Sequence, residues 1–292
     1  MPQSLRQALT QAQSNSVAIG HFNVSDLVVV KAVFGAARQL KVPVLVGASE
    51  GEREFFGVRQ LAAIVKSLRE EFDHPIFLNA DHTHSLAGAV EAARAGFDAV
   101  VFDRSSLPFA ANARETKAAV QALKSINPSI MVEGEIGDIG SGSEIHDTIA
   151  ASAANLSSPA EARAFVEATG VDILAPAVGT SHGMSRSMVQ GSARKHLNIE
   201  RIREIKAASG VFLTLHGGSG TEDEDFTQSI AAGINIIHIN TELRIAWRQG
   251  MQAGLNLNAT ELAPYKVLPS AVAAVEAVVN SRLTLFNAGA HD

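Results

Sequence analysis

Short apolar runs rich in β-branched residues alternate with longer amphipathic stretches along most of the chain. The runs predict eight strands, at residues 17–20, 42–46, 76–79, 99–102, 130–133, 171–174, 211–215 and 234–239. Between them, in stretches such as LAGAVEAARAG and IERIREIKAAS, apolar residues recur with the helical spacing of about 3.6. Eight strands that alternate with helices over roughly 240 residues predict an α/β fold, the (β/α)8 TIM barrel. A doubly wound open sheet is the alternative.

Capping residues mark two helix starts. Ser158, Pro159 and Glu161 have the spacing of an N-cap, a first-turn proline and the partner that completes a capping box. Thr221 and Glu224 have the same spacing and predict a second capping box. Each pair places the start of a helix directly after a predicted loop.

The sequence gives no sign of a second domain. Apolar residues make up 46% and charged residues 18% of the 292 residues, which is typical of a folded globular chain and argues against disorder. No break in composition divides the chain, so residues 1–292 are expected to form one barrel domain. The C-terminal stretch SAVAAVEAVVNSRLTLF predicts an extra helical segment, which covers the barrel or packs on a neighbouring subunit.

Charge and cysteine content narrow the function classes. The net charge of -6 gives no reason to expect nucleic acid or an anionic membrane as a partner. The absence of cysteine excludes disulfides, thiolate zinc sites and cysteine nucleophiles. The N-terminal stretch MPQSLRQALTQAQSNS lacks the apolar region of a signal peptide, and no uncharged apolar run reaches the ~18 residues of a membrane span. A cytoplasmic location is therefore expected.

One predicted connection is unusually long. Residues 134–158 are rich in Gly, Ser and Asp and have neither a helical nor a strand period. A loop of more than about 15 residues in a compact domain is usually a functional lid or a disordered segment. We expect this segment to act as a lid over the mouth of the barrel.

Five histidines fall at or just after the C-terminal ends of predicted strands: His21, His82, His182, His216 and His238. These ends converge on the barrel mouth where active sites are built. Three neutral imidazoles with an open fourth position form a standard catalytic zinc site. His82, His182 and His216 are the best candidates, because each lies in a Gly- or Asp-rich turn, ADHTHS, GTSHGMS and LHGGSG respectively.

A carboxylate lies beside this candidate metal site. Asp81 directly precedes His82, and adjacent residues that leave a strand point in different directions. We therefore expect His82 to face the metal and Asp81 to face the substrate. A carboxylate in that place is a natural general acid and base. A turn or capping aspartate is the structural alternative.

Two turns have the composition of phosphate sites. Gly217, Gly218 and Ser219 follow the seventh predicted strand, and Asn240 and Thr241 follow the eighth. Glycines in such turns expose backbone N–H groups that bind phosphate, and barrels often hold phosphate after strands 7 and 8. The sequence therefore predicts a phosphorylated ligand.

At these residues the chain resembles the class II (zinc-dependent) fructose-bisphosphate and tagatose-bisphosphate aldolases. The resemblance runs nearly end to end and includes GHFNVSDL, LVGASEG, FDRSSLPFAANARETK, VEGEIG, GTSHG and LHGGSG. It implies a carbon–carbon lyase on a TIM barrel. Such an enzyme reversibly cleaves a ketose (bis)phosphate, for example fructose-1,6-bisphosphate, to dihydroxyacetone phosphate and an aldehyde through a zinc-stabilised enolate.

The resemblance also implies roles for individual residues. His82, His182 and His216 match the zinc ligands, and Glu135 matches a further, alternative ligand. Asp81 matches the aspartate that handles the proton on the aldehyde-derived oxygen, and Glu144 is nearest to the mobile-loop glutamate that moves the proton at carbon. The residues expected to bind the substrate or its phosphate are Asn23, Ser49, Gly183, Gly217, Gly218, Ser219, His238, Asn240 and Thr241.

Cofactors and partners follow from the same resemblance. One catalytic Zn²⁺ per subunit is implied, together with a monovalent cation, Na⁺ or K⁺, near Gly183. A phosphorylated ketose is the expected substrate, with a role in carbohydrate metabolism such as glycolysis. A homodimer or homotetramer is expected. The family has a substrate-contacting asparagine where this chain has His238, so the natural substrate can be a different ketose phosphate.

Other functions remain open at this stage. A zinc-dependent hydrolase on the same barrel would use the same histidines and Asp81 to activate water, but it would not explain two phosphate-type turns. A non-catalytic sugar-phosphate-binding homologue is a further alternative. A Schiff-base aldolase needs a lysine at a strand end that faces the mouth, whereas the lysines here fall in helical stretches or loops.

Overall fold

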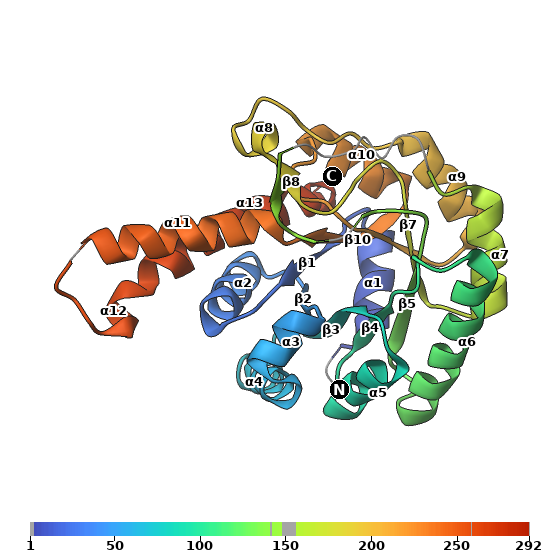
Figure 1. The fold of residues 1–292 in the computed structure, drawn as a ribbon, viewed down its shortest axis with the longest axis horizontal. Coiled ribbons are helices and arrows are strands. Elements are labelled where there is room, and N and C mark those ends of the chain that lie inside the picture. The colour runs from blue at the N-terminus through green and yellow to red at the C-terminus, as the bar shows by residue number, and fades with distance from the viewer. Residues whose placement is uncertain (1–2, 141, 148–155, 258, 292) are drawn as a thin grey trace.

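The computed structural model describes residues 3–140, 142–147, 156–257 and 259–291. Its centre is a closed barrel of eight parallel strands in the order β1-β10-β9-β7-β5-β4-β3-β2 (Figure 1). This confirms the predicted fold class and the eight predicted strands. The strands are β1 Ile19–Asn23, β2 Val44–Ala48, β3 Ile76–Thr83, β4 Ala99–Phe102, β5 Met131–Ile136, β7 Ile173–Pro176, β9 Phe212–Leu215 and β10 Ile234–Ile239.

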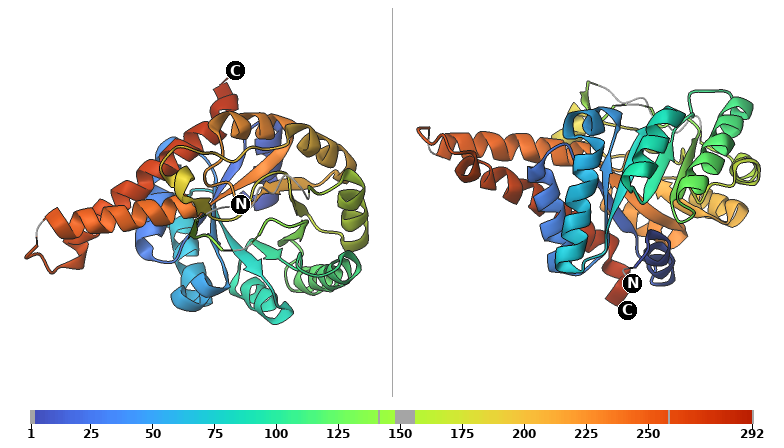
Figure 2. Two further views of the ribbon diagram at one scale, coloured as in Figure 1. Left: turned by 45° about the horizontal axis from the view of Figure 1, so that its top comes forward. Right: turned by 90° about the horizontal axis from the view of Figure 1, so that it is seen from below.

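Helices surround the barrel on its outer face (Figure 2). None of those in the described residues is long and apolar enough to cross a membrane. The α-helices of the described residues, including those outside this ring, are α1 Leu5–Ser14, α2 Leu27–Leu40, α3 Glu50–Phe56, α4 Val58–Phe72, α5 Leu86–Ala95, α6 Phe109–Ile126, α7 Pro159–Thr169, α8 Arg186–Val189, α9 Ile199–Ser209, α10 Asp223–Ala232, α11 Thr241–Leu257, α12 Pro264–Val267 and α13 Pro269–Phe286.

Helix α1 closes the N-terminal end of the barrel. Leu5 and Leu9 on its apolar face pack into one buried cluster with residues from the beginnings of the strands, including Leu45, Phe77 and Met131. A second, larger cluster lies between the strands and the outer helices. Because apolar side chains fill the N-terminal end, polar chemistry is left to the opposite, C-terminal end of the strands.

The long connection after β5 contains a short strand that the sequence did not predict. Strand β6, Ile145–His146, pairs in parallel with β8, Met184–Ser185. Two residues are too few to give a period of their own, and the pairing joins segments about forty positions apart, which a local pattern does not reveal. Residues 148–155 of the same connection lie outside the described residues.

One predicted helix start is confirmed and the other is wrong. Ser158 caps α7, and both hydrogen bonds of the capping box with Glu161 are present. Helix α10 instead has Glu222 as its N-cap residue. The Thr221 side chain is buried, and its hydroxyl has no hydrogen-bond partner among the described residues. The spacing of Thr221 and Glu224 was therefore right for a capping box, but the chain turns into the helix one residue later.

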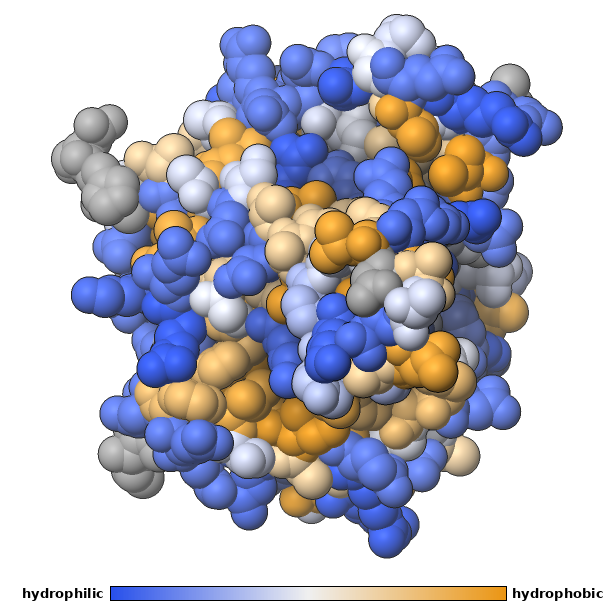
Figure 3. All heavy atoms as spheres, turned by 90° about the vertical axis from the view of Figure 1, so that its left-hand side faces the viewer, coloured by the Kyte–Doolittle hydropathy of each residue, from blue (hydrophilic) through white to orange (hydrophobic). Residues whose placement is uncertain are grey.

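The C-terminal segment forms a helical arm. Helices α11 and α13 pack against each other, and α13 also packs on α2 and β1, so the extra helix covers the barrel (Figure 1). The outer end of the arm carries exposed apolar side chains, as the face in Figure 3 shows. They are Leu255, Leu257, Leu262 and Tyr265. The contact with a neighbouring subunit, and with it the homodimer or homotetramer, stays a prediction that these side chains support.

Strand β5 explains why a glycine separates two glutamates in VEGEIG. Glu133 and Glu135 point into the barrel, and Gly134 faces outward between them. A Cβ atom at Gly134 would lie 2.6 Å from the ring of Phe165 on α7. The missing side chain allows α7 to pack closely against the strand that carries both carboxylates.

Gly134→Ala is expected to lower the free energy of unfolding by about 1–3 kcal/mol, because overpacking of a tight interface costs that much. Urea unfolding measures the change. Gly51→Ala is the matched control, since nothing lies within 4 Å of a Cβ atom there and the helix α3 favours alanine. Equal stability of the Gly134 variant and the wild type would contradict the packing account.

Candidate active site

A cavity of about 250 Å³ opens at the C-terminal ends of the barrel strands. It brings together residues from the loops after most of the strands, as the sequence predicted. Glu135 and His216 are buried next to it. The predicted site residues that line it are Asn23, Ser49, Asp81, His82, Glu144, His182, Gly183, Gly217, Gly218, Ser219, His238, Asn240 and Thr241.

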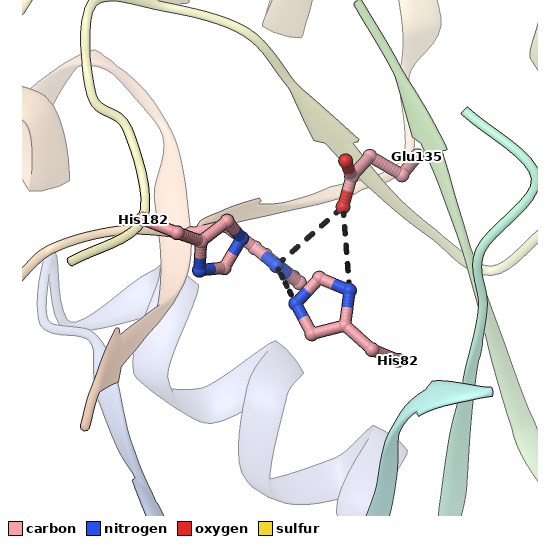
Figure 4. Close-up of side chains that lie close together, drawn as sticks. His82, Glu135 and His182 are labelled. Atoms are coloured by element: carbon pink, nitrogen blue, oxygen red, sulfur yellow. Dashed lines mark hydrogen bonds and ion pairs between the residues drawn. The ribbon is translucent and has the colours of Figure 1, made fainter. Parts of the chain in front are cut away.

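Three imidazoles and one carboxylate meet beside this cavity (Figure 4). One ligand atom from each of His82, Glu135, His182 and His216 lies within 4.8 Å of the others. His82 Nε2 is 3.2 Å from His216 Nδ1, and Glu135 Oε2 is 3.6 Å from His216 Nδ1. These are the four residues predicted as metal ligands, and they come from strands β3 and β5 and from the loops after β7 and β9.

Two carboxylates orient the imidazoles. Asp103 Oδ2 is 2.9 Å from His82 Nδ1, and Glu133 Oε1 is 2.7 Å from His216 Nε2. The Thr214 hydroxyl donates to the other oxygen of Glu133. Such contacts fix the ring orientation and leave His82 Nε2 and His216 Nδ1 free to bind a cation, as is usual for histidine ligands of metals.

The cluster fits a divalent cation. Two nitrogen ligands of one tetrahedral zinc ion lie about 3.3 Å apart, given Zn–N bonds of about 2.0–2.1 Å. The 3.2 Å between His82 Nε2 and His216 Nδ1 agrees with that spacing. His182 Nε2 and Glu135 Oε2 are buried and have no hydrogen-bond partner among the described residues. Buried polar atoms without partners are costly, and a shared cation would satisfy both of them.

The close approach of buried imidazoles and carboxylates shifts several pKa values in this cluster. Burial opposes a charged His82, but Asp81 and Asp103 outweigh it and raise the pKa of His82 to about 10. Burial, with help from Asp103, raises the pKa of Glu135 to about 7. Burial and the neighbouring imidazoles hold the pKa of His182 well below its usual value. Bound metal requires neutral imidazoles, so a cation and the His82 proton compete for one site.

Asp81 and His82 both line the cavity but belong to different groups of potential ligands, since His82 lies with Glu135, His182 and His216 and Asp81 lies with His21 and His238. The register of β3 against β4 shifts between Ala80 and Thr83, and His82 has a left-handed φ of 38°. This irregularity breaks the alternation of a regular strand and brings Asp81 Oδ1 to 4.0 Å from His82 Nε2. Strained backbone of this kind persists where the surrounding structure enforces it, often at active sites.

Asp81 is held by contacts from three sides. Asn23 Nδ2 donates to its Oδ2 at 2.9 Å, and His238 Nδ1 is 3.5 Å from its Oδ1. Arg53 Nη1 donates to its backbone carbonyl oxygen. Burial alone would raise the pKa of Asp81, but the imidazoles of His82 and His21 and the bond from Asn23 keep it well below its usual value. The group is therefore an ionised, oriented carboxylate.

Two glycine-rich turns, residues 179–183 after β7 and residues 216–220 after β9, lie against each other. A Cβ atom at Gly217, where φ is 64°, would lie 2.5 Å from the backbone oxygen of Ser181, so only glycine fits. The backbone N–H groups of Gly183 and Ser219 have no acceptor among the described residues. The Ser219 hydroxyl accepts from the backbone N–H of Asn240. The arrangement offers free donors to an anion at this part of the cavity.

The predicted lid segment contributes to the cavity wall. Ser143 and Glu144 are among its lining residues, and the Glu144 side chain is exposed. Asn240 Nδ2 donates to the Ser143 hydroxyl, and the backbone N–H of Met184 donates to the Glu144 carbonyl oxygen. These two hydrogen bonds connect the segment to strand β8 and to the loop after β10.

Sequence reasoning missed several residues of this site. Asp103, Glu133 and Lys195 were not singled out, nor was Arg244, whose guanidinium lines the rim and pairs with Glu52 at 2.8 Å. Asp103 follows strand β4 and Glu133 lies in VEGEIG, so the position of each carboxylate in or directly after a predicted strand could have identified both as candidates. His21 was noted only as a histidine at a strand end. Its ring stacks on His238 with centroids 3.5 Å apart.

The barrel, the imidazole cluster and the glycine-rich turns are the features expected of an enzyme with a metal ion and an anionic substrate at the barrel mouth. Residues 3–291 match the family described as fructose-bisphosphate aldolase class-II. The fructose-bisphosphate aldolase of Thermus caldophilus is 33% identical over 301 residues, which cover 96% of each chain.

Two solved structures agree with this match. The YdjI aldolase from Escherichia coli K12 superposes with a TM-score of 0.82 at 27% identity, and the match covers 98% of this chain and 97% of that one. A putative fructose-1,6-biphosphate aldolase from Coccidioides immitis gives 0.82 at 26%, with 97% and 96% covered. The chain therefore belongs to the class II fructose-bisphosphate aldolase family and is an aldolase, a carbon–carbon lyase. The family depends in general on zinc.

Asp103→Asn is expected to weaken zinc binding by about 10–100-fold, the usual effect of removing a carboxylate that orients a histidine ligand. Competition with a chelator measures the affinity. Asp223→Asn is the control, because Asp223 is an exposed residue of α10 that pairs with Arg282. A zinc affinity equal to that of the wild type would show that Asp103 does not orient a metal ligand.

Proposed function

We propose that the chain is a zinc aldolase for a ketose 1-phosphate that carries a second anionic group at its far end, as fructose-1,6-bisphosphate does. The observation that carries this proposal is the meeting of three imidazoles, one ionised aspartate and two glycine-rich turns at one cavity. A zinc hydrolase would need the imidazoles and the aspartate but has no use for the two turns. The names of the relatives support the aldolase reading.

One Zn²⁺ per subunit would be held by His82, His182 and His216, with Glu135 as an alternative ligand. Three imidazoles are typical zinc donors, and they leave the fourth position of the ion open for substrate or for Glu135. When bound, the ion supplies Lewis-acid stabilisation of the charge that develops as the carbon–carbon bond breaks. Asp103 and Glu133 keep His82 and His216 in the orientation that binding requires.

The phosphate end of the substrate binds at the two glycine-rich turns. The free N–H groups of Gly183 and Ser219 donate to phosphate oxygens, and Gly217 and Gly218 complete the wall. Asn240 and Thr241 line the same cavity at the start of α11. Binding energy from this phosphate orients the reacting carbon atoms, although the phosphate itself does not react.

Asp81 accepts the proton of the C4 hydroxyl during cleavage and returns it during condensation. The contact with Asn23 holds the carboxylate in place for this transfer. Glu144, on the predicted lid, exchanges the proton at the carbon that becomes the carbanion. Both groups line the cavity, and the lid reduces the access of water to the reacting atoms.

The far end of the substrate meets Arg244 and Ser49. Among the described residues that line the cavity, Arg244 is the single lysine or arginine. A guanidinium pairs well with phosphate or carboxylate, so Arg244 favours a second anion at this end. Glu52 holds Arg244 at 2.8 Å and accepts from the Ser49 hydroxyl at 2.9 Å, which joins the two residues.

Asp81→Asn is expected to retain zinc and to lower turnover of fructose-1,6-bisphosphate by about 10²-fold or more, the usual contribution of a general acid and base. The asparagine keeps the acceptor for Asn23 but cannot take up the hydroxyl proton. Metal analysis and steady-state cleavage on the same sample test this. Unchanged turnover would remove Asp81 from the mechanism, and a wild type that cleaves no phosphorylated ketose would overturn the proposed function.

His238→Asn is expected to shift the preference among phosphorylated ketoses towards fructose-1,6-bisphosphate by roughly two- to tenfold, the weight of one polar contact. His238 lines the cavity and lies 3.5 Å from the carboxylate of Asp81, at a place where it can contact the substrate hydroxyls. The ratios of kcat/KM for a panel of ketose phosphates measure the preference. An unaltered profile would show that His238 does not read the substrate.

A further inference from the structure

A buried lysine lies behind the two glycine-rich turns. The side chain of Lys195 is almost fully buried, and its Nζ contacts three backbone carbonyl oxygens. These are Ser181 O at 2.6 Å, Gly183 O at 2.6 Å and Gly217 O at 2.9 Å. Lys195 does not line the cavity. Its ammonium therefore contacts the phosphate-binding turns from the side opposite the ligand.

The backbone of Lys195 is fixed to the second of these turns. Its N–H donates to Gly220 O at 2.9 Å, and its carbonyl oxygen accepts from Glu222 N at 3.2 Å. The side chain starts from this anchored point beside the turn after β9 and reaches the turn after β7. One residue thus joins both turns, and no rearrangement is needed to bring its ammonium to the three oxygens.

The acceptor set selects the charged form of the side chain. Three carbonyl oxygens match the three protons of an ammonium group, and a neutral amine has only two to donate. Burial lowers the pKa of Lys195 to about 7, and the carboxylate of Glu242 opposes that shift. Glu242 also accepts the backbone N–H of Gly220, the residue whose carbonyl oxygen accepts from the N–H of Lys195.

We propose that Lys195 is a positioning residue whose ammonium acts as a built-in cation: it clamps the two phosphate-binding turns together and makes a dissociable Na⁺ or K⁺ unnecessary for phosphate binding. The carbonyl groups of Gly183 and Gly217 accept from the ammonium, which holds the backbone next to the free N–H groups of Gly183 and Ser219 and adds positive charge behind the phosphate. The inference rests on the proposed binding of a ketose 1-phosphate at these turns.

The three carbonyl oxygens around the Lys195 ammonium, here called the carbonyl cage, allow a specific test of the proposal with added cations. Carbonyl oxygens also bind K⁺, as they do in the filters of potassium channels. Truncation of Lys195 to alanine leaves the three oxygens around an open space that K⁺ or NH₄⁺ can enter. A methionine of similar length instead fills that space with an apolar chain and blocks the cation.

The test measures the binding of dihydroxyacetone phosphate to zinc-loaded protein by calorimetry, first with tetramethylammonium chloride and then with KCl. The wild type is expected to bind equally in both salts. Lys195→Ala should bind about tenfold or more weakly in tetramethylammonium, because hydrogen bonds to a charged group contribute that much. KCl should restore most of the loss. Lys195→Met should lose binding to the same degree and gain nothing from KCl.

Lys206→Ala is the matched control. Lys206 Nζ also donates to three oxygens, those of Gln13, Val211 and Asn235, but near helix α1 at the other end of the barrel. Its loss should leave dihydroxyacetone phosphate binding unchanged in both salts. If it weakens binding as Lys195→Ala does, the loss is not specific to the turns and the proposal is overturned.

The outcomes separate this inference from the proposed function. A wild type that does not bind dihydroxyacetone phosphate overturns the proposed function and the clamp with it. A wild type that binds, together with a Lys195→Ala protein that binds as tightly in either salt, overturns the clamp alone. If KCl raises the melting temperature of Lys195→Ala more than that of the wild type, the result supports K⁺ binding by the three carbonyl oxygens. This measurement needs no phosphate ligand. If the alanine protein does not fold, Lys195→Met decides: undiminished binding overturns the clamp.

Discussion

The candidate active site depends on two carboxylate–imidazole contacts, a partly buried one between His82 and Asp103 and a buried one between His216 and Glu133. Each contact uses one ring nitrogen and thereby aims the other at a common point. Without them, rings packed so closely could turn to other partners, since His216 also stacks on His238 with centroids 4.1 Å apart. A cation shared by the cluster would offset part of the cost of burying these groups, so the proposed metal site and the fold of the barrel mouth would be coupled.

The barrel makes this arrangement possible because the apolar residues that stabilise it and the polar residues of the candidate site lie at opposite ends. Helix α1 and the first residues of the strands fill the N-terminal end with apolar side chains. The opposite end can then carry buried polar groups, each held by a neighbour from another strand. The two glycine-rich turns lie side by side because their strands, β7 and β9, are adjacent in the sheet. The proposed metal ligands and the proposed phosphate donors therefore meet, although more than 130 residues separate His82 from His216.

The sequence predicted the barrel and the main site residues because both follow from strand ends. All eight strands were predicted, and His82, His182 and His216 lie at the C-terminal end of one of them or in the loop that follows. The rest depended on contacts that no local pattern encodes. Asp103 and Glu133 gain their roles from imidazoles on other strands. The irregularity at Asp81 and His82 breaks the alternation that the prediction assumed. Lys195 looked like a loop lysine, because only the folded chain shows the three carbonyl oxygens around it.

The central claim is that His82, His182 and His216 share one divalent ion. X-ray absorption at the zinc edge of the loaded protein tests it most directly. The account predicts a single zinc environment with three imidazole ligands at about 2.0–2.1 Å, and one fewer imidazole in a His182→Ala protein. A spectrum without imidazole scattering, or one that is the same in the wild type and the His182 variant, would contradict it.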